Sequence, residues 1–121
     1  MLLNRGFKPQ DIQHYLHTTE DDILDPLLIN NMRGGAEMLA KHIKANHKVL
    51  VQVDSDCDGY TSAAVLINYL NCVFPSWAQN NVSYRVHDAK IHGLLQDTVS
   101  GVHLVIAPDA SSNDYEVHAA L

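Results

Sequence analysis

Three short runs rich in valine and other strand-forming residues lie along the chain, separated by longer segments. They lie at residues 48–53 (KVLVQV), 81–87 (NVSYRVH) and 102–107 (VHLVIA). The first run is almost continuously apolar and rich in β-branched residues, a pattern that predicts a buried strand of a parallel sheet. We expect all three runs to form strands, with helices in the segments between them.

Segments with an apolar residue every three or four positions precede and separate these runs, and they predict helices. In residues 34–47 the apolar stripe consists of Ala36, Leu39, Ala40 and Ile43. Further helices are predicted at residues 8–19, 61–74 (ending before Pro75), 91–99 and 112–121, with short helical pieces in residues 21–32. Strands that alternate with helices predict an α/β fold, a mostly parallel sheet flanked by helices.

The chain of 121 residues is long enough for one compact domain. We expect residues 1–47 to form a helical lead-in packed on the sheet, and residues 48–121 to form an α/β domain that is incomplete at its C-terminus. The sequence lacks a membrane-spanning apolar run, a signal-peptide arrangement and a disulfide framework, which favours a cytoplasmic location. A net charge of −6 gives no general attraction to nucleic acid, although a metal could neutralise an acidic site locally.

Candidate chemistry lies directly after two of the predicted strands. Asp54, Asp56 and Asp58 occupy alternate positions after the first strand, and Asp109 follows the third. Like charges this close repel one another, which favours a bound cation, and carboxylate oxygens suit Mn²⁺ or Mg²⁺. The carboxyl ends of parallel strands share one edge of a sheet, so the two loops should meet there. Gly59 would let the backbone turn tightly into the next helix.

Four interpretations of the acidic loop are open. The Asp-x-Asp-x-Asp-Gly pattern begins an EF-hand calcium loop, but Val65 stands where the bidentate Glu is required. Aspartate-nucleophile phosphatases also place Asp-x-Asp after a strand, usually without a third aspartate such as Asp58. The loop could also be solvated, with Asp58 or Thr61 capping the helix. We favour a divalent-metal site for phosphate-ester hydrolysis, in which two ions about 3.5–4 Å apart clamp the phosphate.

The motifs resemble those of one enzyme family. VQVDSDCDGYTSAAVLINYL resembles the first motif of the DHH phosphoesterase superfamily, and LVIAPDASSND resembles the second. LLNRGF followed by DILDPLLINNM is similar to the lead-in of the RecJ-type single-strand exonucleases within it. The resemblance implies catalytic and metal-binding roles for Asp56, Asp58 and the bridging Asp109, with Asp54 as a further ligand or close partner. It also implies two Mn²⁺ or Mg²⁺ ions in the complete enzyme.

The resemblance further implies a function. The Asp-His-His motif is absent, and the sequence ends at YEVHAAL, so we expect an inactive N-terminal part of a longer exonuclease acting on single-stranded DNA. A DHH hydrolase of short oligonucleotides or cyclic dinucleotides, and a non-catalytic binding or regulatory module, are the alternatives. Membrane association is not expected. The candidates for substrate contact are Thr61, Ser62, His92, Ser111 and Asn113.

Overall fold

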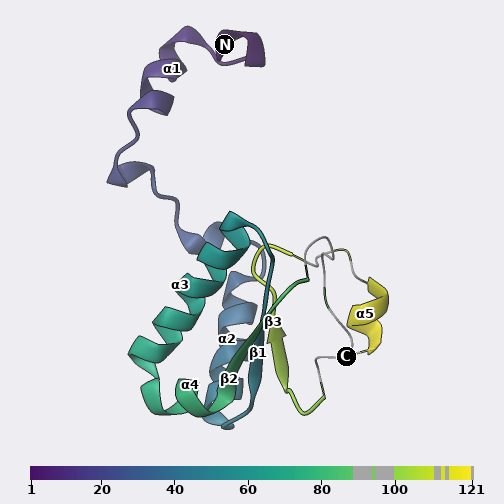
Figure 1. Ribbon diagram of the computed structural model, residues 1–121. Helices are drawn as coiled ribbons and strands as arrows, with labels where there is room; N and C mark the ends of the chain where they lie inside the picture. The colour runs from purple at the N-terminus through teal and green to yellow at the C-terminus, as the bar shows by residue number, and fades with distance from the viewer. Residues whose placement is uncertain (89–93, 95–99, 111–112, 114, 121) are drawn as a thin grey trace. The chain divides into compact units, whose positions relative to one another are not determined.

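The computed structural model describes residues 1–88, 94, 100–110, 113 and 115–120 (Figure 1). The chain divides into two compact units, Met1–Gly35 and Ala36–Leu121. Among the described residues, no helix combines the length and the apolar character needed to cross a membrane.

The first unit is built from one α-helix and short 3₁₀ turns. Helix α1 (Pro9–Leu16) starts with a proline, whose fixed φ suits the first helical position. The turns are η1 (Leu3–Arg5), η2 (Glu20–Asp22) and η3 (Pro26–Leu28). The Asp25 carboxylate caps η3 by accepting a hydrogen bond of 2.8 Å from the Leu27 amide. The predicted helix and the predicted short helical pieces around Pro26 are therefore present.

The second unit contains a three-stranded parallel sheet in the order β2-β1-β3. The strands are β1 (Val49–Val53), β2 (Val82–Val86) and β3 (Leu104–Ile106). The central strand β1 is buried along its whole length, as its continuous apolar pattern predicted. The predicted α/β fold with a parallel sheet flanked by helices is confirmed.

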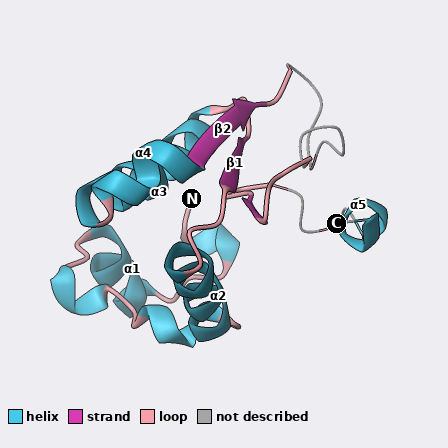
Figure 2. Ribbon diagram, turned by 90° about the horizontal axis from the view of Figure 1, so that it is seen from below, coloured by secondary structure: helices cyan, strands magenta, loops and turns pink. Residues whose placement is uncertain are grey.

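In the part of the chain that the structure describes, four helices accompany the sheet: α2 (Met32–Lys44), α3 (Cys57–Val73), α4 (Pro75–Asn81) and α5 (Tyr115–Ala120). Helices α2, α3 and α4 lie on one side of the strands and α5 lies on the other (Figure 2). Helix α3 ends before Pro75 as predicted, but α4, which the sequence pattern did not predict, begins at that proline. The helix predicted at residues 91–99 falls outside the described residues, apart from Leu94.

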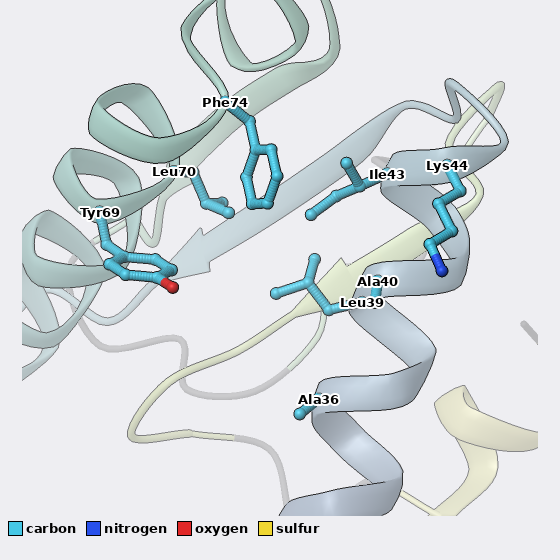
Figure 3. Close-up of a pocket in the computed structure, with 8 residues that line it drawn as sticks. All are labelled: Ala36, Leu39, Ala40, Ile43, Lys44, Tyr69, Leu70 and Phe74. Carbon is cyan, nitrogen blue, oxygen red and sulfur yellow. The ribbon is translucent and has the colours of Figure 1, made fainter.

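Apolar side chains join the helices to the sheet. The core cluster consists of Val51, Val53 and Ala63, with Leu66, Ile67, Val82 and Val86 packed against it. The predicted stripe on α2 faces α3 across an apolar groove of about 290 Å³ (Figure 3). The groove is lined by Ala36, Leu39, Ala40, Ile43, Lys44, Tyr69, Leu70 and Phe74. The helical spacing therefore placed these four apolar residues on one face of α2, and this face lines the groove without being buried.

Three histidines from separate segments meet near the start of β1. The Nδ1 atoms of His42 and His47 lie 3.1 Å apart, and the rings of His47 and His103 stack with centroids 4.2 Å apart. Loss of water around His47, followed by the charges of His103, His42 and Lys41, lowers the pKa of His47. The folded chain therefore favours the neutral form of this imidazole.

This cluster predicts a loss of stability in weak acid. A lowered folded-state pKa means that the unfolded chain binds more protons, so the free energy of unfolding should fall as the pH drops below the ordinary value of 6.5. Urea unfolding at about pH 7.5 and about pH 5.5 measures the effect. His47→Asn keeps a donor near the Nδ1 position but cannot titrate, so it should reduce the decrease. An equal decrease in the variant would assign the pH dependence to other groups.

Candidate metal centre

The loop between β1 and α3 holds two carboxylates through its own backbone. Asp54 directly follows β1 and is 5% exposed, and its Oδ1 accepts a hydrogen bond of 2.7 Å from the Ser55 amide. Asp56 is the N-cap of α3, and its Oδ1 accepts a hydrogen bond of 3.1 Å from the Gly59 amide. The helix cap considered from the sequence therefore exists, but Asp56 provides it rather than Asp58 or Thr61.

Gly59 brings the start of α3 against the end of β1. A Cβ atom added at Gly59 would lie 2.6 Å from the Asp54 carbonyl oxygen and 2.7 Å from the Asp54 Cβ. Gly59 lies in α3 and does not have a positive φ, so the expectation that it permits a tight turn was wrong. The position requires glycine because the two backbone segments approach each other too closely for a side chain.

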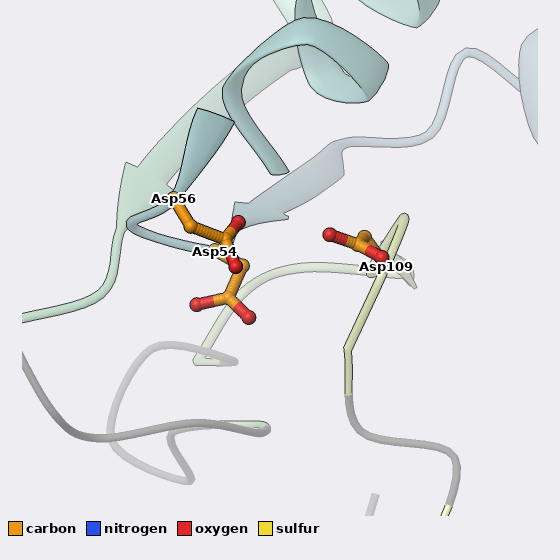
Figure 4. A group of neighbouring side chains, drawn as sticks. All are labelled: Asp54, Asp56 and Asp109. Atoms are coloured by element: carbon orange, nitrogen blue, oxygen red, sulfur yellow. The ribbon is translucent and has the colours of Figure 1, made fainter. Parts of the chain in front are cut away.

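Asp109 approaches the same place from the loop after β3. Its φ of 74° is left-handed, a conformation that aspartate adopts more readily than most residues. Asp54, Asp56 and Asp109 each offer a carboxylate oxygen, and these oxygens all lie within 4.8 Å of one another (Figure 4). Two loops about fifty residues apart in sequence thus converge at one edge of the sheet. We define these three residues as the aspartate cluster.

The electrostatics of the aspartate cluster fit a cation. Loss of water, then the negative charges of Asp58, Asp56 and Asp54, raises the pKa of Asp109. Asp58 was predicted together with these residues but is not part of the aspartate cluster, although its charge contributes to the raised pKa of Asp109 ahead of those of Asp56 and Asp54. Three hard oxygen donors that repel one another match the ligand set of Mn²⁺ or Mg²⁺.

Comparison with known proteins gives two kinds of relative. Over its full length the chain is 38% identical to a prophage-derived protein of Bacillus subtilis strain 168, provisionally named single-strand DNA-specific exonuclease YorK. A protein of Bacillus phage SPbeta with the same provisional name matches to the same extent. Over 71 residues, 58% of the chain and 9% of the relative, it is 31% identical to the single-stranded-DNA-specific exonuclease RecJ of Bacillus subtilis. The resemblance to RecJ-type proteins is confirmed.

The chain spans 20% of the length of its YorK relatives, about a fifth. No protein-family model matches it, and no solved structure gives a significant match. The RecJ-type relationship therefore comes from individual relatives, and the roles of single residues in this chain stay predictions.

The residues predicted to contact substrate have different environments. The Thr61 hydroxyl donates to the carbonyl oxygens of Cys57 at 2.9 Å and Asp58 at 3.2 Å, and the Ser62 hydroxyl donates to the Gly59 carbonyl at 3.1 Å. Both hydroxyls would have to exchange these helix bonds to donate to a phosphate. Asn113 is exposed just before α5. His92 and Ser111 lie outside the described residues.

His87 adjoins the aspartate cluster but was not predicted as part of the site. Its Nδ1 lies 3.2 Å from Asp54 Oδ1, and both side chains are buried. The sequence nevertheless contained a feature that could have identified His87. His87 directly follows β2 as Asp54 directly follows β1, and these two strands are neighbours.

Neutralising Asp109 should stabilise the metal-free chain and weaken its response to metal. Asp109→Asn removes the repulsion that raises the Asp109 pKa, keeps the side-chain shape and tolerates the left-handed backbone. We expect a higher Tm than wild type in chelator and a smaller rise in Tm with millimolar Mn²⁺. Asp21→Asn, which makes the same charge change in the first unit, controls for net charge. A lower Tm for Asp109→Asn in chelator would show that Asp109 stabilises the fold without metal.

Proposed function

We propose that this chain is the N-terminal part of a metal-dependent phosphodiesterase of the DHH/RecJ type that hydrolyses single-stranded DNA as an exonuclease. The observation that carries the proposal is the convergence of Asp54, Asp56 and Asp109 from two strand-end loops. The names of the relatives support the substrate class, since each name, provisional for the two YorK proteins, describes an exonuclease specific for single-stranded DNA.

The aspartate cluster would hold the metal, with Asp58 close by. A bound Mn²⁺ or Mg²⁺ supplies positive charge that polarises the phosphodiester and lowers the pKa of the attacking water. The loop backbone contributes by holding the ligands, because the Ser55 and Gly59 amides orient the carboxylates of Asp54 and Asp56. The left-handed backbone at Asp109 directs the third carboxylate toward them.

We further propose that hydrolysis needs residues outside these 121. The Asp-His-His motif implied by the resemblance does not occur in this sequence, and the YorK relatives are about five times as long, since the chain covers 20% of them. The second metal ion and the binding of the nucleic-acid strand would depend on those further residues. The aspartate cluster then supplies one half of a site that the longer protein completes.

The test is hydrolysis by a longer protein that contains this chain. End-labelled single-stranded and duplex oligonucleotides are incubated with it and Mn²⁺, and products are followed on a gel. We expect stepwise release of nucleotides from the single strand alone, and background hydrolysis by the 121-residue chain. Cleavage of dinucleotides or cyclic dinucleotides but not of longer strands would support the short-oligonucleotide hydrolase. Absence of hydrolysis on every substrate would support a binding module.

A further inference from the structure

A buried histidine–aspartate pair joins β1 and β2 at the edge that carries the aspartate cluster. The side chains of His87 and Asp54 are 0% and 6% exposed, with 3.2 Å between His87 Nδ1 and Asp54 Oδ1. The His87 amide donates to the Val53 carbonyl at 3.0 Å, which continues the parallel pairing past the point where Val53 faces Val86. Backbone pairing therefore fixes the positions of both residues.

The contact constrains the Asp54 carboxylate more than the loop alone can. Rotation about the last side-chain bond of aspartate is soft, so a single hydrogen bond leaves its plane loosely defined. Here Oδ1 accepts from two donors, the Ser55 amide at 2.7 Å and His87 Nδ1 at 3.2 Å. The donors come from different segments, one in the loop after β1 and the other after β2. Together they define the direction in which the carboxylate faces.

We propose that His87 is a positioning residue that holds the Asp54 carboxylate in its metal-binding orientation, an inference that rests on the proposed function. The aspartate cluster does not include His87 among its converging ligand atoms, so its role is to orient a ligand. Hydrogen-bond partners of metal ligands typically change metal affinity by about 10- to 100-fold when removed. Removing the His87 donor should therefore weaken Mn²⁺ binding within this range.

Three substitutions of His87 distinguish the positioning role from a purely structural role. In His87→Asn the amide nitrogen takes nearly the place of Nδ1 and can still donate to Asp54. In His87→Gln the amide lies one bond farther out, near the place of Nε2, and His87→Leu fills the space with no donor. A buried carboxylate that loses a donor costs stability whatever its function, so stability alone does not decide between the two roles.

The experiment measures the Kd for Mn²⁺ of the 121-residue chain from the EPR signal of the free ion, together with the free energy of unfolding in chelator. We expect His87→Leu and His87→Gln to bind about 10- to 100-fold more weakly than wild type, and His87→Asn to stay within about threefold. If His87→Leu does not fold, the comparison of Asn with Gln decides. Variants that lose stability but keep the wild-type Kd would overturn the positioning role while leaving the proposed function intact. Absence of Mn²⁺ binding in the wild type would instead contradict the proposed function itself.

Discussion

Asp56→Asn, introduced into the longer protein, should lower manganese-dependent hydrolysis of single-stranded DNA by about a thousandfold or more. A catalytic metal ion supplies several kcal/mol of transition-state stabilisation, and each 1.36 kcal/mol corresponds to about a tenfold change in rate. The substitution isolates this role because asparagine caps a helix about as well as aspartate does. The cap of α3, in which the residue 56 side chain accepts from the Gly59 amide, should therefore survive.

Two further variants make this result specific. Asp56→Ala removes both the ligand and the cap, so it should be inactive and also lose about 1 kcal/mol of stability. Asp21→Asn changes the same charge in the first unit and should leave kcat/KM unchanged. Near-normal activity of Asp56→Asn, combined with lower stability of Asp56→Ala, would reduce Asp56 to a helix cap. That result would favour the solvated-loop interpretation of this segment.

Gly59→Ala should destabilise the fold by about 1–3 kcal/mol, although alanine is the better helix former. The added methyl group would meet the Asp54 carbonyl oxygen at 2.6 Å and its carbonyl carbon at 2.9 Å. These are backbone atoms, so no rotamer change relieves the contact, and the loop that carries Asp54 must move. Urea unfolding measures the stability, and weaker Mn²⁺ binding should accompany the loss.

Helix α2 offers a matched control for this substitution. Gly35 lies in that helix, and a Cβ added there would meet nothing within 4 Å. Gly35→Ala should therefore stabilise the chain by about 0.5–1 kcal/mol, as helix propensity alone predicts. If Gly59→Ala were stabilising to the same degree, the close approach of α3 to β1 would not constrain the site.

The spacing of apolar residues was sufficient to predict the three strands and most of the helices that the structure describes. The continuous apolar character of KVLVQV predicted the buried central strand, and the spacing of Ala36, Leu39, Ala40 and Ile43 predicted the apolar face of α2 that lines the groove. Because the carboxyl ends of parallel strands share one edge of a sheet, the sequence also predicted that Asp109 lies near Asp54 and Asp56, as the structure shows. In contrast, α4 was missed because a proline that ends one helix can also begin the next.

The details of the site depend on three-dimensional contacts that spacing does not contain. Alternation along the chain grouped Asp58 with Asp54 and Asp56, but α3 begins at Cys57, so the period-2 pattern stops at Asp56. The requirement for Gly59 arises from contact with Asp54 across the loop. The His87 pair depends on which strands are neighbours, and the order β2-β1-β3 cannot be deduced from periodicity.

The central claim is that Asp56 and Asp109, from two loops, bind one cation together. The most direct test is a double-mutant cycle on the Mn²⁺-induced rise in Tm of the 121-residue chain, using Asp56→Asn, Asp109→Asn and both together. If the residues share an ion, each single variant should lose most of the rise, and the double variant should lose no more than either one. The claim would be contradicted if the two substitutions reduced the Mn²⁺-induced rise in Tm independently and additively. It would also be contradicted if the double variant kept the full rise.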